Sequence, residues 1–498
     1  MASAARVITA QTIDSRRTAT SRGLFLALLA VLLPLGIVSL VLPPPVVLAI
    51  LPPSVLMCIW IWRKPIRGLY LILIGAMMIE ILPLQFPDSL TDRIPLFLNL
   101  NNSGILGYYS INPAEILMLT VIAIWVASTV SARTFRLPAG RVVRPYAIFM
   151  AVVLGAEVIG LLAGGDFKLS LWELRPQVYG FIAFVLAASL IVERADVRRL
   201  SVIFFLAVGI KAFLAFYRYY FTLHRVLGGW LRESIMAHEE SYFWAVFLIA
   251  VLAALIYYRR RRPLVPLLLA SPLVLFVLYQ NQRRAGEFAF IIGGAVIVLL
   301  GVGFEPVARR HLIAGTVTVT VAFALFTAVF WDQQRGFAAE VVRPVRSLIQ
   351  PSQRDYLSDI YRTAENANLH LSFQSSPVVG MGFGRPFLVV FPQANIAYID
   401  PLWNIIPHNN LLWIGVRMGA VGFMAFWALI GMAILEGTRQ LAVRRDPLLR
   451  AAAAFAIGAI IAEVVVASGD LQLENYRNIL FFGATLGLLD ALPRVADA

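Results

Sequence analysis

The sequence has few of the residues that mark soluble or secreted proteins. Only 14% of its 498 residues are charged, whereas a soluble domain averages about 25%. The single cysteine, Cys58, excludes intramolecular disulfides and a cysteine metal cluster. Lysine is also scarce, because only three of the 42 basic residues are lysines. These scarcities exclude a soluble enzyme, a disordered protein and a secreted disulfide scaffold.

Long hydrophobic runs are abundant instead. Hydrophobic residues make up 60% of the chain, and the mean hydropathy is +0.79. A segment of roughly 20 apolar residues can cross a bilayer. We therefore expect an all-α integral membrane protein with about 14 transmembrane helices. Their predicted cores are 23–42, 46–62, 68–84, 113–131, 145–163, 174–192, 200–220, 241–258, 263–280, 286–304, 311–331, 408–435, 451–468 and 478–492.

The basic residues predict the orientation of the chain. The net charge is +14, and 25 of the 42 basic residues fall in one set of alternate short connections. Basic residues collect on cytoplasmic loops, so this charge does not require nucleic acid as a partner. We expect a cytoplasmic N-terminal tail at 1–22 and a cytoplasmic C-terminal tail at 493–498. The first segment is expected to be a retained signal anchor.

One long connection is predicted on the opposite face. Residues 332–407 separate transmembrane helices 1–11, at 23–331, from helices 12–14, at 408–492. This large extracytoplasmic loop has helical stretches near 338–349 and 353–374, and the second is amphipathic. A glycine-rich turn follows, and a long ordered loop is usually functional.

Five cationic residues are predicted at the outer ends of membrane helices, namely Arg175, Arg225, Arg283, Arg284 and His408. Each one alone also fits an interfacial or helix-capping role. Together they lie where the even-numbered helices present N-termini, which carry free N–H groups and partial positive charge. We therefore predict a cationic pocket that suits a dianion such as a lipid pyrophosphate.

Acidic residues give a weaker prediction. Three of them fall within membrane segments: Glu80, Glu157 and Glu463. Buried acids suggest a function, yet pairing with Lys211 or Arg218 would be a sufficient structural reason. Glu287 lies near the level of the cationic pocket and is expected to orient an arginine. No histidine–acid cluster indicates a metal, and no phosphate-binding glycine loop or hydrolase motif is present.

Several short motifs together resemble the O-antigen ligase and O-antigen polymerase superfamily. His408-Asn409, the leucines that follow and Gly419-Ala420-Val421-Gly422 resemble its H-N-x-x-L…G-x-x-G signature. The Gly-Met-Gly-Phe-Gly turn at 380–384 resembles its G-x-G-x-G stretch. Arg284-Ala285-Gly286 resembles its Ser-Arg-Gly element, and Arg225 its upstream arginine. The resemblance covers residues 225–422.

The sequence departs from that family pattern at two positions. Arg417 stands where the family usually has an acid, and Arg283 stands where it usually has a serine beside the arginine. Both changes add positive charge to the predicted pocket. Fourteen segments also exceed the twelve that are common among ligases, which favours a polymerase or a divergent ligase.

The resemblance implies a GT-C-like glycosyltransferase of the bacterial cytoplasmic membrane. Its donor would be an undecaprenyl-diphosphate-linked oligosaccharide, and its acceptor a glycan or lipid hydroxyl on the outer face. Inverting transfer would need no metal or cofactor, and other polysaccharide-assembly proteins are expected partners. His408 would be the general base, kept neutral by nearby arginines and supported by Asn409. The expected diphosphate-binding residues are Arg225, Arg284, Arg283, Arg175 and Arg417.

Two other classes of function remain open from the sequence. A flippase for lipid-linked oligosaccharides, or another transporter, also fits a chain with many membrane helices. Transporters often have two related halves, and this sequence has no such symmetry. A non-catalytic membrane scaffold is the third possibility. It predicts that substitutions of His408 and Arg284 change only stability.

Overall fold

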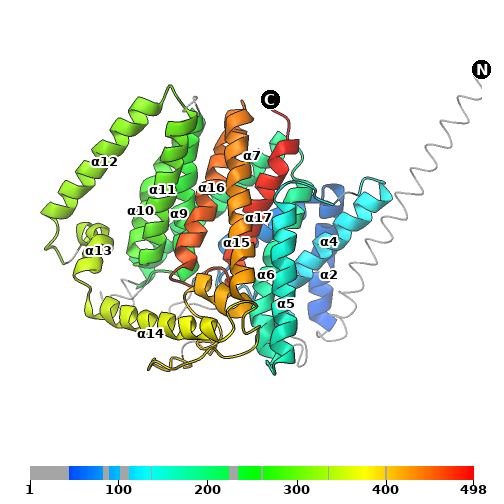
Figure 1. Cartoon of the computed structure of the whole chain (residues 1–498). Helices are drawn as coiled ribbons and strands as arrows, with labels where there is room; N and C mark the ends of the chain where they lie inside the picture. Colours follow the sequence, from blue (N-terminus) through cyan, green and yellow to red (C-terminus); the bar gives the residue numbers. More distant parts are fainter. Residues whose placement is uncertain are drawn as a thin grey trace, which may run out of the picture.

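The protein is all-helical in the parts of the chain that are described. The computed structural model describes residues 44–81, 89–100, 111–135, 137–223, 234–258, 262–334, 336–398 and 401–497 (Figure 1). Nine helices in these ranges are long and apolar enough to cross a membrane. The helices are α2 (Pro44–Arg63), α3 (Ile66–Met78), α4 (Pro113–Ser131), α5 (Val143–Leu162), α6 (Phe167–Leu190), α7 (Arg194–Tyr217), α9 (His238–Tyr257), α10 (Val265–Gln280), α11 (Arg284–Phe304), α12 (Arg309–Val329), α13 (Phe337–Ile349), α14 (Gln353–Ser375), α15 (Asn410–Val443), α16 (Pro447–Ala467) and α17 (Tyr476–Ala491).

The predicted membrane segments from 46–62 onward each overlap one of these helices. Segment 23–42 and the N-terminal tail lie outside the described residues. The largest difference at a helix start is in α6, which begins seven residues before the predicted core at 174. The reason is a cap, because the Asp166 carboxylate accepts a hydrogen bond from the Leu169 amide at 2.8 Å. Hydropathy alone does not detect such a polar first turn.

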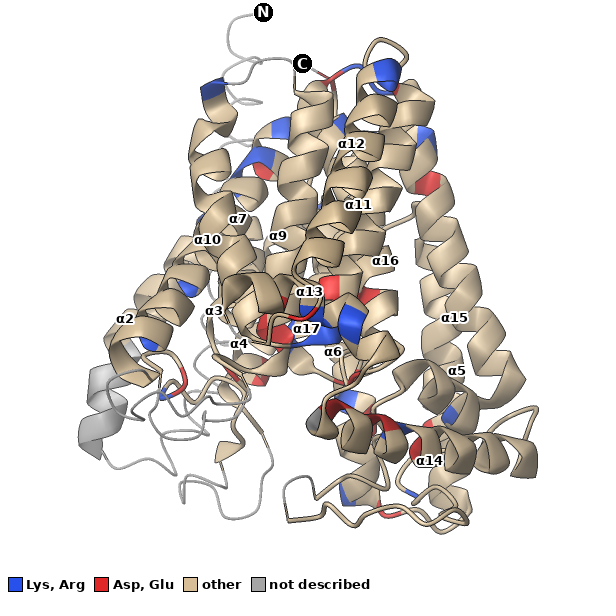
Figure 2. Cartoon of the chain, turned by 90° about the vertical axis from the view of Figure 1, so that its left-hand side faces the viewer, with Lys and Arg blue, Asp and Glu red and all other residues tan. Residues whose placement is uncertain are grey.

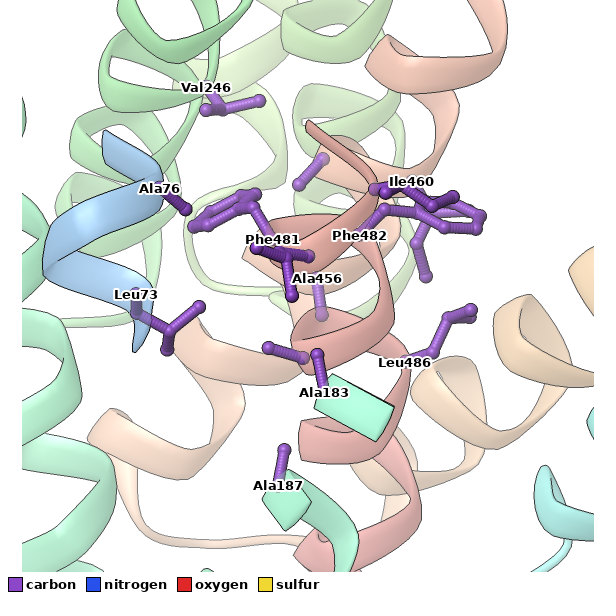
Figure 3. Close-up of a cluster of buried hydrophobic side chains, with 14 of the residues drawn as sticks. Leu73, Ala76, Ala183, Ala187, Val246, Ala456, Ile460, Phe481, Phe482 and Leu486 are labelled. Atoms are coloured by element: carbon purple, nitrogen blue, oxygen red, sulfur yellow. The ribbon is translucent and has the colours of Figure 1, made fainter. Parts of the chain in front are cut away.

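Helix α17 lies at the centre of the apolar core (Figure 3). Its residues Phe481 and Phe482 lie among side chains from α3, α6, α9 and α16. Gly483 of α17 faces Gly180 of α6 so closely that a Cβ on Gly483 would stand 2.0 Å from the Gly180 carbonyl oxygen. Small residues allow this close approach of two backbones, as in other membrane helix pairs.

Basic connections meet at the end of the bundle that carries the C-terminus (Figures 1 and 2). Arg194 pairs with Asp446 at 2.6 Å, and Arg444 pairs with Asp497 at 3.1 Å. Arg450 donates to the Phe304 carbonyl at 2.9 Å. We call this the basic end. The loops that the sequence predicted on one side of the membrane lie together at this end.

The long loop covers the opposite end, which we call the loop end (Figure 1). Helices α13 and α14 confirm the two helical stretches that the sequence predicted in this loop. Phe337 of α13 stacks on Phe276 of α10, with ring centroids 5.9 Å apart. Helix α14 lies across the bundle, and the Ser352 hydroxyl caps it by accepting from the Asp355 amide. The N-terminal ends of α11 and α15 lie against this helix.

Candidate functional site

The site is built along α14, which contacts the N-terminal ends of both α11 and α15. Asp359 accepts two hydrogen bonds from the Arg284 guanidinium, at 2.5 and 3.3 Å. Six residues later on the same helix, Glu365 binds His408. An α-helix rises about 1.5 Å per residue, so the two contacts are separated by about 9 Å along α14. The structure thus brings the two principal predicted residues to one helix.

His408 is held by a buried carboxylate. Its Nδ1 lies 3.1 Å from Oε1 of Glu365, and its backbone amide donates to Oε2 at 3.1 Å. The Tyr361 ring stands edge-on to the imidazole, with centroids 5.6 Å apart. The carboxylate favours a proton on Nδ1, which leaves Nε2 as the acceptor nitrogen. A histidine oriented in this way has the arrangement of a general base.

The pKa of His408 is shifted in the direction opposite to the one expected from the sequence. Burial lowers the pKa of His408, but the hydrogen bond and charge of Glu365, together with Asp470, raise it above its ordinary value. Arg362 opposes this rise only weakly. The sequence prediction counted nearby arginines and did not include two carboxylates that are distant along the chain. The imidazolium is therefore favoured more than the sequence indicated.

A second histidine shares this environment. His238 begins α9, and its Nδ1 lies 3.2 Å from Oδ2 of Asp470, in the connection between α16 and α17. Burial raises the pKa of Asp470, but His238, His408 and Arg362 together hold it below its ordinary range. Asp470 is therefore an ionised carboxylate that links the two histidines electrostatically.

Asn409 directly precedes α15. Its side-chain oxygen accepts from the Leu412 amide at 3.1 Å, which makes it the N-cap residue. Its amide nitrogen also donates to Asn366 of α14 at 3.3 Å. Asn409 therefore supports His408 by fixing the start of α15 against the helix that carries Glu365.

The glycine-rich turn binds a kink in α15. Gly419 interrupts that helix with a φ of 64°, which frees backbone groups on both sides of it. The amides of Met381 and Gly382 donate to the carbonyls of Val416 and Arg417, at 2.8 and 3.0 Å. Glycine is required at Gly419 because a Cβ there would stand 2.2 Å from a carbonyl oxygen of the turn. The two glycine motifs therefore form one structural unit.

The same turn also fits closely against α5. Gly382 has a φ of 75°, and a Cβ on it would lie 2.2 Å from the amide nitrogen of Gly160. Gly384 is similar, with a φ of 73°, and its amide donates to the Glu173 carboxylate at 2.7 Å. The turn that follows α14 is thereby fixed between α15, α5 and α6.

Arg417 is buried in a network of structural contacts, and its predicted part in binding the diphosphate stays a prediction. Its side chain is 0% exposed and pairs with Glu173 of α6 at 2.5 Å. Its other nitrogens donate to the carbonyls of Ile405 and Arg385, at 2.7 and 2.6 Å. With its donors engaged by the loop and by α6, Arg417 holds the loop on the bundle.

The remaining predicted arginines are less central than Arg284. Arg175 lies inside α6 and contacts Glu115 at 3.5 Å and Asn99 at 3.3 Å, a set of partners separate from that of α14. Arg283 is the N-cap residue of α11. Arg225 lies outside the described residues.

Glu287 lies buried one turn into α11. Arg343 and Arg284 are both among its electrostatic neighbours. The supporting role in which Glu287 orients an arginine stays a prediction. The described residues contain no group of three or more histidine, cysteine or acidic side chains that could hold a metal ion.

Two of the predicted membrane acids have structural partners. Glu80 pairs with Lys211 at 2.5 Å, which confirms one of the two pairings that the sequence left open. Lys211 also lies 3.6 Å from Glu240, which pairs with Arg477 at 2.7 Å. Two acidic and two basic side chains thus pair with one another in a buried cluster. Glu157 accepts from a serine hydroxyl at 2.7 Å.

The sequence prediction missed five polar residues of the site: His238, Asp359, Arg362, Glu365 and Asp470. Three of these lie on α14, and their spacing of three residues places them on one side of a helix. That spacing, within a stretch already recognised as amphipathic, was the available signal. Asp470 and His238 carry no local pattern, because only the tertiary fold brings them together.

The site thus combines two pairs of side chains. In one, Glu365 orients His408; in the other, the partly buried Arg284 binds the exposed Asp359. The side chain of Arg284 is 16% exposed and that of Asp359 is 45% exposed. An anion that reaches Arg284 would therefore compete with a solvated carboxylate. No model of a known protein family matches the chain, and no curated protein is similar to it.

Proposed function

We propose that the protein is a membrane glycosyltransferase that uses an undecaprenyl-diphosphate-linked oligosaccharide. It would transfer or polymerise glycan repeat units onto an acceptor hydroxyl at the outer face of the bacterial cytoplasmic membrane. Polymerisation is favoured over ligation. The observation that carries the proposal is the Glu365–His408 pair beside Arg284, which α14 also contacts through Asp359.

His408 is the proposed general base. Nε2 accepts the proton of the acceptor hydroxyl as the oxygen attacks the anomeric carbon. The imidazolium that forms is stabilised by Glu365, whose carboxylate lies 3.1 Å from Nδ1. The same contact raises the pKa of His408 above its ordinary value, which suits a group that must take a proton.

Arg284 is the proposed ligand of the diphosphate. A guanidinium binds phosphate oxygens with two parallel hydrogen bonds, as Arg284 now binds Asp359. Arg362, on the helix α14 that carries Asp359, adds a second positive charge. The bond from the anomeric carbon to the phosphate oxygen breaks, and both arginines offset charge on the departing diphosphate. Attack from the opposite side inverts the anomeric centre.

The proposal also includes the topology. The loop end would face the exterior, and both termini would be cytoplasmic, because the basic end collects the arginine-rich loops. Segment 23–42 and helices α2, α3, α6 and α17 would complete fourteen membrane helices in a GT-C-like arrangement. The overlap of α2, α3, α6 and α17 with predicted membrane segments supports this count.

Purified protein incubated with a lipid-linked repeat unit alone tests the reaction. Chain lengthening identifies a polymerase, and product formed only after a lipid acceptor is added identifies a ligase. H408A should lower the rate by about 10²- to 10⁴-fold. The matched control is H370A, because His370 lies on α14 but is exposed and contacts only Gln374 among the described residues. Full activity of H408A in membranes would refute the base role.

Donor binding tests the second role. R284Q should weaken binding of the lipid-linked donor about tenfold or more, since a charge-assisted pair is lost. R445Q is the control, because Arg445 is exposed at the basic end. Unchanged donor binding in R284Q would remove the diphosphate role. If H408A and R284Q alter only stability, the protein is a scaffold.

A further inference from the structure

A partly open cavity lies at the basic end, far from α14. It has a volume of about 530 Å³ and is lined by residues of α3, α6, α7, α9, α10, α16 and α17. Alanines form much of its wall, among them Ala250, Ala254, Ala451, Ala452 and Ala484. Small side chains at these positions leave space that leucine or phenylalanine would fill.

The chemistry of the wall determines what can occupy this space. Almost all lining side chains are apolar, and Arg198, Ser201 and Thr485 are the main polar ones. A buried water needs two to four polar partners, so water is a poor occupant of such a wall. An empty apolar cavity destabilises a protein in proportion to its volume. An apolar chain is therefore the suitable occupant, and in a bilayer the available chains are those of lipids.

The rim of the cavity carries a positive charge. Arg198 lines it and is exposed, and the described residues provide no ion pair for its guanidinium. The nearest acid in sequence, Asp196, is already engaged by Lys64 at 3.0 Å and Arg199 at 3.3 Å. Arg262 is also exposed, directly before the lining residue Pro263. This rim suits an anionic headgroup.

We propose that the cavity binds one anionic phospholipid of the adjacent leaflet, with an acyl chain among the alanines and the phosphate at Arg198. Basic pockets between membrane helices recognise anionic headgroups in this way. A guanidinium binds a phosphate more strongly than it binds a neutral group. The site is independent of the proposed glycosyl transfer, because it lies at the opposite end of the bundle.

Native mass spectrometry of the delipidated full chain tests the headgroup. Phosphatidylglycerol should bind at least about tenfold more tightly than phosphatidylcholine, and R198Q should weaken phosphatidylglycerol about tenfold. R445Q, at the same end but outside the cavity, should bind like the unchanged protein. Equal binding of both lipids, or equal effects of R198Q and R445Q, would overturn the proposal. Tighter binding of a polyisoprenyl phosphate than of phosphatidylglycerol would also overturn it.

A second measurement locates the acyl chain. A452F should fill the cavity and lower phosphatidylglycerol binding about tenfold. If A452F does not fold, F455W places a fluorescent probe in the wall. Phosphatidylglycerol with brominated chains should quench F455W at low lipid ratios, whereas F423W, at an exposed position on α15, should need a lipid excess. Equal quenching of the two probes would contradict an occupied cavity.

Discussion

Two arginine–carboxylate pairs at the loop end have opposite environments. The Arg417–Glu173 pair is 0% exposed on both sides and joins α15 to α6. The Arg284–Asp359 pair is partly exposed and joins α11 to α14. The sequence placed both arginines in one diphosphate pocket. The structure shows instead that one is enclosed by protein groups and the other has a partner that solvent can reach.

The difference shows how burial divides one class of residue into two roles. A buried ion pair has no free donors to offer and costs much when one partner is removed. A partly exposed pair contributes little to stability, so its partner can be exchanged for a ligand. Positive charge alone therefore does not identify a binding residue. The number of engaged donors and the exposure of the partner do.

The largest expected effect comes from breaking the buried pair. R417Q leaves the Glu173 carboxylate uncompensated and should destabilise the protein by about 3–5 kcal/mol. R284Q should change stability by less than about 1 kcal/mol. Thermal unfolding in detergent measures both. Equal stability of the two variants would show that the distinction between the pairs is wrong.

Removing the Glu365 charge has the next largest effect. E365Q should lower turnover about 10²-fold, because His408 loses its orienting carboxylate. His408 must be neutral to act, so activity rises with pH through its pKa. Glu365 raises that pKa, and E365Q should therefore move the acid limb of the pH–rate profile to lower pH. An acid limb that stays in place or moves to higher pH would contradict the predicted direction of the shift.

The glycine turn at 380–384, like the Arg417–Glu173 pair, belongs to the tightly packed part of the loop end. G382A combines a positive φ with contact against the α5 backbone and should cost about 2 kcal/mol or more. G431A is the control, because nothing lies within 4 Å of a Cβ at Gly431 on α15. Alanine there should be neutral or stabilising by up to about 1 kcal/mol. Similar melting temperatures for the two variants would remove the constraint assigned to the turn.

The smallest effect is expected at Asp359. D359N removes the competitor of a bound diphosphate, so donor affinity should rise by up to about fivefold. Stability should change by less than about 1 kcal/mol. D332N, at an exposed aspartate of the same loop, should leave binding unchanged. Weaker donor binding by D359N would indicate that Asp359 positions Arg284 rather than competing for it.

Local patterns predicted the helices and one half of the site. Apolar runs and the amphipathic stretch of α14 depend on neighbours in sequence, so the chain itself reveals them. Glu365 lies 43 residues from His408, and Glu173 lies 244 residues from Arg417. Packing at the loop end brings these partners together, and no short spacing in the sequence predicts them. The electrostatic reasoning from sequence left out Glu365 beside His408 and Glu173 beside Arg417, because both carboxylates are distant along the chain.

The different attachments at the two ends of α14 have a mechanical consequence. At its C-terminal end, the chain passes directly into the glycine turn that is wedged between α5 and α15. Nearer its N-terminal end, α14 contacts α11 through the partly exposed Arg284–Asp359 pair, and Asp355 pairs with Arg343 of α13 at 3.1 Å. The glycine turn is the more rigid of these attachments. Displacement of α14 would therefore separate Asp359 from Arg284 by more than it separates Glu365 from His408.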